Sequence, residues 1–239
     1  MGLITTILVI ILIIVILSWI ISYMNSNSAQ LTSVQNGNEE QTISASSLPS
    51  NSNTSNYTYS TWFYVTDWNY RFGEPKVLLA RLDQDNVPSP SIVLGAMENN
   101  ITISVSCYPT VGNSGTTLND HIIHKCEVRN FPLQKWVNLI ISLNGQTLDV
   151  YIDGKLFRTC VLPGVAKINS TANVIVTPDG GFAGYTGNFR YWANPSNPQQ
   201  AYNIYKSGYG GTGFGNFFEQ YRIRVQFLDN NQVEGSFEI

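Results

Sequence analysis

The first hydrophobic pattern along the chain is a long apolar run. Residues 3–23 are mostly Ile, Leu and Val, with four Thr or Ser residues among them and no charged side chain. At 1.5 Å per residue, roughly 20 apolar residues span the ~30 Å hydrocarbon core of a bilayer as one helix. Aromatic residues at its carboxyl end suit the lipid headgroup level. The pattern predicts a single-pass transmembrane anchor over 1–24, with the membrane-embedded residues Leu3, Ile10, Leu17, Trp19 and Tyr23.

Two other interpretations of this run are open. A cleavable signal peptide would have a basic start, a shorter apolar core and a small-residue cleavage site, and the chain fits these features poorly. Gly2, followed by Thr6, also fits the loose pattern for myristoylation. Because the first basic residue is Arg71, the positive-inside rule leaves the orientation of the anchor open.

The next segment, 25–56, is almost wholly Ser, Asn, Gln, Thr and Gly, and Glu39 and Glu40 are its only charges. Such a composition has too few apolar residues to form a core of its own. It predicts a flexible linker with an end-to-end distance of about 30 Å. Alternatively, the segment becomes ordered in a groove on a partner protein.

From Tyr57 onward, apolar and polar positions alternate with a period of two, and turn residues recur about every ten positions. Asn144-Gly145 and Asp153-Gly154 are typical of type I′ hairpin turns. We predict an all-β fold, a two-sheet antiparallel sandwich or jelly roll over 57–216, with a strand extension over 217–239. The expected strands are 57–65, 77–81, 91–96, 102–107, 122–128, 136–143, 147–152, 155–160, 173–176, 184–192 and 220–227.

Composition narrows the classes of partner and site. The 239 residues are 12% charged with a net charge of −3, and no run of Lys and Arg occurs, so we expect no nucleic-acid partner. Three cysteines without a C-x-x-C spacing argue against structural zinc. Cys107 and Cys126 lie in segments that could be neighbouring strands and could form a disulfide; buried free thiols, Cys160 included, are the alternative.

One stretch carries a family resemblance. In 136–156 a Trp opens a strand, an Asn-Gly hairpin follows, and an apolar strand ends in Asp-Gly-Lys. This stretch resembles the central hairpins of laminin G-like domains, in the concanavalin A-like lectin/glucanase superfamily. Residues 181–192 resemble the family's penultimate glycine and aromatic strand, and 198–205 its closing helix. The similarity covers about 57–211 and implies a concanavalin A-like sandwich.

Catalytic chemistry has little support in the sequence. Glycosidases on this fold need two carboxylates at the scissile bond, and a strand of pattern Glu-x-Asp-x-Glu would present them on one face. The chain lacks this pattern. Asp83 and Asp85 are two apart but precede a loop. With Asn86 they could supply oxygen ligands to calcium, although three oxygens are too few for a site and a solvated turn is the alternative. We expect no enzyme and no other cofactor.

Aromatic residues are the remaining candidates for binding. Exposed Tyr and Trp stack on sugar rings and also anchor protein interfaces. The candidate interface or glycan contacts are Tyr185, Trp192, Tyr205, Tyr209 and Phe214.

The combination of anchor, spacer and sandwich looks like structural proteins of large DNA viruses that have an internal membrane. It favours a non-enzymatic minor capsid protein of the virion that ties the internal membrane to the capsid shell, with the lipid bilayer and capsid proteins as partners. The alternative is a membrane-anchored lectin or adhesion module that binds glycans, and a degenerate glycoside hydrolase is a third reading.

Overall fold

The computed structural model describes residues 12, 15, 29–30, 32–49, 54–83, 85, 87–109, 122–210, 224–229 and 232–238. Within these ranges no helix is both long enough and apolar enough to cross a membrane. Several residues singled out from the sequence lie outside them, namely Leu3, Ile10, Leu17, Trp19, Tyr23, Asn86 and Phe214.

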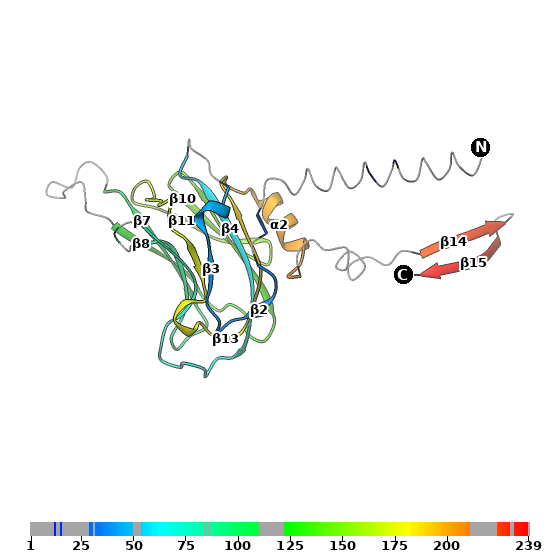
Figure 1. Cartoon of the computed structure of the whole chain (residues 1–239), viewed down its shortest axis with the longest axis horizontal. Coiled ribbons are helices and arrows are strands. Elements are labelled where there is room, and N and C mark those ends of the chain that lie inside the picture. The colour runs from blue at the N-terminus through cyan, green and yellow to red at the C-terminus, as the bar shows by residue number, and fades with distance from the viewer. Residues whose placement is uncertain are drawn as a thin grey trace.

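Two antiparallel sheets pack face to face (Figure 1). The seven-stranded sheet has the order β1-β13-β4-β9-β10-β11, and β2 also pairs with β13. Its strands are β1 (Ala29–Gln30), β2 (Gln35–Asn36), β4 (Tyr57–Asp67), β9 (Trp136–Asn144), β10 (Thr147–Ile152), β11 (Lys155–Val161) and β13 (Ala183–Trp192).

The six-stranded sheet has the order β3-β12-β5-β6-β7-β8. Its strands are β3 (Gln41–Ile43), β5 (Lys76–Leu82), β6 (Pro88–Leu94), β7 (Ile101–Cys107), β8 (Ile122–Val128) and β12 (Val174–Val176). The other elements are the short helices η1 (Ala45–Ser47) and η2 (Pro178–Gly180), the helix α2 (Pro198–Lys206), and a separate hairpin of β14 (Arg224–Asp229) with β15 (Gln232–Glu238).

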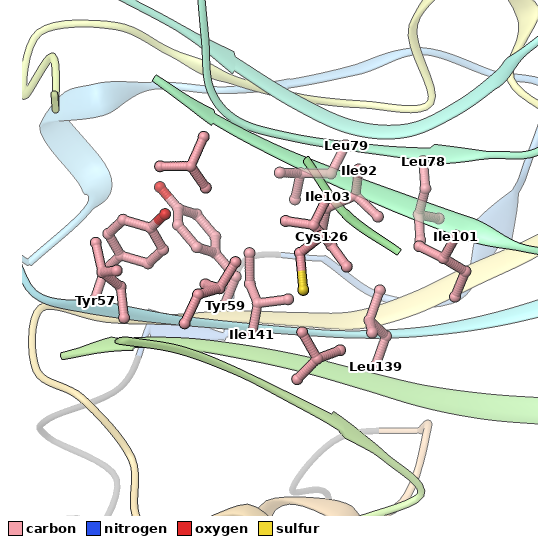
Figure 2. Close-up of a cluster of buried hydrophobic side chains, with 14 of the residues drawn as sticks. Tyr57, Tyr59, Leu78, Leu79, Ile92, Ile101, Ile103, Cys126, Leu139 and Ile141 are labelled. Carbon is pink, nitrogen blue, oxygen red and sulfur yellow. The ribbon is translucent and has the colours of Figure 1, made fainter. Parts of the chain in front are cut away.

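The core lies between the sheets and follows directly from the alternation. On β4, Tyr57, Tyr59, Phe63 and Val65 join the buried core, because alternate residues of a strand face the same side of a sheet. The facing strands supply Leu, Ile and Val. Figure 2 shows this packing, in which side chains of β4 and β9 meet those of β5, β6 and β7. The predicted all-β, two-sheet sandwich is confirmed.

One of the two predicted hairpin turns differs in detail. At the β10–β11 turn, Asp153 and Gly154 both have positive φ, as a type I′ turn requires. At the β9–β10 turn, Asn144 is still paired with Thr147, and Gly145-Gln146 forms the two-residue loop. Only Gly145 has positive φ there, which is the type II′ pattern rather than the predicted type I′.

Part of the segment expected to be a linker belongs to the sandwich. Strands β1 and β2 pair with β13 at one edge of the first sheet, and β3 pairs with β12 at the edge of the second. Ile43 and Leu48 reach the core and are at most 8% exposed. Backbone groups at an open sheet edge accept almost any extended partner, so a polar segment can pair there without an alternating pattern of its own.

The opposite side of the sandwich is closed by a disulfide. Cys126 on β8 is bonded to Cys160 on β11, and these are the edge strands of the two sheets. Cys107 is a buried free thiol. The suggested Cys107–Cys126 pairing is therefore wrong. The two cysteines do lie on neighbouring strands, but Cys126 is opposite Ile103 while Cys107 is opposite Ile122, so their side chains are far apart along the ladder.

Candidate functional site

Helix α2 covers part of the outer face of the seven-stranded sheet (Figure 1). Asn197 begins it with a capping box, in which its side chain accepts from the Gln200 N–H and the Gln200 side chain accepts from the Asn197 N–H. Ala201 and Ile204 then pack on Ile140 and Tyr151 of the sheet. The predicted closing helix over 198–205 is thus confirmed, and its position creates a boundary for a pocket.

The pocket lies between α2 and the β10–β11 turn and has a volume of about 520 Å³, in the range of small-ligand sites. Gly154 allows the two elements to approach. A Cβ atom there would lie 2.8 Å from the Tyr205 Cβ atom, and φ is +72°. The residues lining the pocket are Pro132, Ile152, Asp153, Lys155, Leu156, Phe157, Tyr202 and Tyr205.

Aromatic and aliphatic side chains dominate the mouth of the pocket. Leu156 is 51% exposed, Phe157 53% and Tyr202 44%, values that are high for large apolar groups. Strand β11 shifts its register between Arg158 and Leu156, where these residues pair with Val150 and Tyr151 of β10, and Phe157 falls in this irregularity. The result is an exposed aromatic surface held by a strand, a turn and a helix.

The charged groups at the pocket differ in whether the protein already pairs them. Asp153 is tied to the scaffold, since its Oδ1 accepts from the Asn138 backbone N–H at 2.9 Å and its Oδ2 lies 3.0 Å from Lys135 Nζ. The Lys155 side chain is exposed and makes no hydrogen bond or ion pair within the described part of the chain. Lys206, on α2, lies over the Tyr202 ring with Nζ 5.8 Å from its centroid.

Two of the aromatic residues proposed from the sequence form part of this region. Tyr205 lines the pocket and stacks on Trp62, with ring centroids 5.5 Å apart. Tyr209 stacks on Trp136 at 4.5 Å with nearly parallel rings. Both rings are therefore engaged with the sheet on one side, which fixes their orientation.

The other sequence-predicted residues lie elsewhere. Tyr185 is 44% exposed and pairs across from Tyr64 on β4, and Trp192 is half-buried at the far end of β13. Neither lines the pocket. Sequence reasoning missed Tyr202, Leu156 and Phe157. Leu156 and Phe157 are adjacent apolar residues on a strand whose neighbouring strands alternate, and this break in the pattern was a usable signal.

The acidic pair proposed for calcium shapes a turn. Asp83 Oδ1 accepts from the backbone N–H groups of Asp85, at 2.9 Å, and Val87, at 2.8 Å. Across the described ranges, no group of three or more His, Cys, Asp or Glu side chains is placed to hold a metal ion. The geometry found for Asp83 is that of a side chain that organises its own loop.

Solved structures offer similar folds. The chain resembles the ligand-binding domain of botulinum neurotoxin serotype D, solved in complex with N-acetylneuraminic acid, at 13% identity and a TM-score of 0.50, covering 74% of this chain and 46% of that one. It also resembles the binding domain of botulinum neurotoxin DC, solved in complex with SialylT, at 13% identity and a TM-score of 0.50, covering 75% and 50%. This chain thus spans about half of each domain. At this identity the likeness shows a shared fold.

The sequence itself also matches a family model. No curated protein matches the chain. The model of the concanavalin A-like lectin/glucanases superfamily matches residues 36–201, more than half of the 239 residues, and begins at β2. The topology, the closing helix and this match agree, and the chain belongs to the concanavalin A-like lectin/glucanase superfamily.

Proposed function

We propose that this protein is a carbohydrate-binding module and that the pocket between α2 and the β10–β11 turn holds the sugar. The observation that carries the proposal is the exposed aromatic surface of Phe157 and Tyr202 beside charged and hydroxyl groups in one pocket. The C–H faces of a pyranose pack on aromatic rings, and its hydroxyls need hydrogen-bond partners at the edge. Membership of a superfamily that includes lectins, and folds shared with domains solved with sialylated ligands, support it.

The proposed role is binding without catalysis. Glycoside hydrolysis needs two carboxylates about the scissile bond. Asp153 is the one carboxylate among the lining residues that the structure describes, and it is held by Lys135 and by a backbone N–H. An acid fixed in this way supports the shape of the turn.

The disulfide is consistent with a protein that binds glycans outside the cell. Disulfides form and persist mainly in oxidising compartments, which include the cell exterior. The Cys126–Cys160 bond joins the two sheets at an edge that also carries β11 and hence Phe157. The binding surface is therefore attached to a covalently fixed edge.

Replacing Tyr202 with alanine should weaken glycan binding by roughly tenfold, because a stacked aromatic ring contributes on the order of 1–2 kcal/mol. Tyr185→Ala is a matched control, because Tyr185 has the same 44% exposure and lies outside the pocket. Glycan-array retention of the full-length chain identifies the sugar, and titration calorimetry compares the variants.

The two variants distinguish sugar binding in the pocket from sugar binding at the Tyr185 surface. Loss of binding in Tyr202→Ala with retention in Tyr185→Ala supports the pocket. Equal binding by wild type and Tyr202→Ala, or loss only in Tyr185→Ala, contradicts it. Thermal unfolding of each variant separates a binding defect from a folding defect.

A second candidate, a membrane-anchored minor capsid protein linking an internal membrane to a shell, is favoured by the apolar run at 3–23. The membrane attachment in this second role and the sugar pocket use different parts of the chain. The run has the length and composition of a spanning helix, and the sandwich would supply lateral protein contacts.

For the anchor, the full-length chain should stay in the membrane pellet after an alkaline carbonate wash. The double variant Ile10→Asp and Leu17→Asp should be released, because each buried carboxylate costs about 3 kcal/mol in a bilayer. The capsid role further requires that a symmetric shell protein accompanies the native protein through mild detergent extraction. Release of the wild type by the carbonate wash would contradict the anchor. Extraction as a lone monomer would contradict the capsid role.

A further inference from the structure

We infer that the pocket prefers a pyranose that carries an anionic group, a carboxylate or a sulfate, and that Lys155 binds that group. The inference rests on the proposed function and concerns the same site. It starts from the charges that line the pocket and from which of them are already paired.

The one carboxylate that lines the pocket in the described part of the chain is already paired with protein groups. Recognition of a neutral sugar depends on acceptors such as carboxylates, which take hydrogen bonds from hydroxyl groups. Both oxygens of Asp153 have partners, the Asn138 N–H at 2.9 Å and Lys135 Nζ at 3.0 Å. The Asp153 carboxylate is also mostly shielded, with 22% of its side chain exposed, so its charge is already balanced by Lys135 rather than directed at a ligand.

The donor of the pocket is available. Lys155 follows the Asp153-Gly154 turn at the start of β11 and lines the pocket. Its side chain is exposed, and no ion pair or hydrogen bond holds it among the described residues. An ammonium group with three donors and no acceptor is matched by a carboxylate or sulfate oxygen, and such charge-assisted hydrogen bonds are about twice as strong as neutral ones.

The charged side chains next to the pocket's lining residues are also positive. Lys135 is paired with Asp153, and Lys206 lies over the ring of Tyr202, and both of these partners line the pocket. One lysine and one aspartate thus line the pocket and two further lysines contact its lining residues, in a chain whose net charge is −3. A local positive charge on an acidic protein concentrates anions at that site.

The aromatic and cationic groups lie close enough to act on one ligand. Phe157 and Lys155 are two residues apart on β11, and Tyr202 reaches the same pocket from α2. A ring stacked on these aromatic residues would place a substituent toward the turn, where Lys155 begins the strand. A hexose with a negatively charged substituent satisfies both halves of this surface.

The experiment is a titration of the full-length chain in mild detergent with lactose, 3′-sialyllactose and 3′-sulfolactose. We expect each anionic sugar to bind at least about fivefold more tightly than lactose, and the difference to shrink as salt is raised from 50 to about 500 mM. Lys155→Gln should weaken anionic binding by roughly tenfold and lactose binding by much less, so that the preference for the anionic sugars is lost, whereas Lys155→Arg should retain most of the affinity. Lys125→Gln, an exposed lysine on β8, is the control for net charge.

The outcomes separate the inference from the proposal on which it rests. If no sugar binds, the carbohydrate-binding function itself fails. Equal affinity for lactose and the anionic sugars, or loss of anionic binding in Lys125→Gln as large as in Lys155→Gln, overturns the inference while sugar binding stands. Preference for only one of the two anionic sugars identifies the group, carboxylate or sulfate, that the site takes.

Discussion

Replacing Cys160 with serine should lower the free energy of unfolding by about 3–4 kcal/mol. The Cys126–Cys160 bond closes a sequence separation of 34 residues, and the loss of chain entropy on closing a loop of this size in the unfolded state gives that magnitude. For a domain of this size the melting temperature should fall by roughly 10 °C. Differential scanning calorimetry or chemical denaturation measures the change.

A reductant provides the internal control for this prediction. Adding it should bring the melting temperature of the wild type close to that of Cys160→Ser and leave the variant unchanged. Cys107→Ala, which removes the buried free thiol, should remain sensitive to the reductant. A wild type that melts identically with and without reductant would show that the bond does not form in the native protein.

Replacing Phe63 with alanine should destabilise the fold by about 3–5 kcal/mol. Phe63 lies fully buried on β4 and contacts two other rings, with centroids 5.4 Å from Phe131 and 6.3 Å from Phe182. Removing it leaves a cavity between the sheets that the surrounding strands cannot fill. Urea denaturation should show a lower midpoint with a similar slope.

The same substitution at Phe157 is the matched control. Phe157 is 53% exposed on the edge strand β11, so alanine there should change the unfolding free energy by less than about 0.5 kcal/mol. It should nevertheless weaken sugar binding, because its ring lines the pocket. If both variants unfold with the same midpoint, the division between a buried core and an exposed binding surface is wrong.

The sequence predicted the sandwich because several of its strands carry their own signal. Residues 122–128 and 147–152 were expected as strands and are β8 and β10 with the same bounds. Alternation is strong there because one face of each strand meets the core. The Asp153-Gly154 turn was predicted for the same kind of reason, since its positive φ values demand those residues.

The features that escaped prediction depend on long-range pairing. The polar strands β1, β2 and β3 are ordered by the edges of two sheets rather than by their own composition. The partner of Cys126 could not be chosen without knowing that β8 and β11 end up as facing edges. The pocket combines residues separated by more than forty positions, Phe157 and Tyr202, so no local motif announces it.

The candidate residues that the sequence did supply were found by residue type. Tyr205 lies in the pocket and Tyr209 stacks beside it on Trp136, whereas Tyr185 and Trp192 occupy other parts of the sheet. Aromatic residues serve in cores, in stacking layers and at binding surfaces alike, and only the tertiary structure distinguishes these roles.

The most direct test of the central claim is a crystal structure of the protein with a bound oligosaccharide selected from the glycan array. The account predicts electron density for a pyranose ring packed on Tyr202 and Phe157, between α2 and the β10–β11 turn, with its anionic group within hydrogen-bond distance of Lys155. Density for the sugar at another face of the sandwich, with this pocket empty, would contradict it.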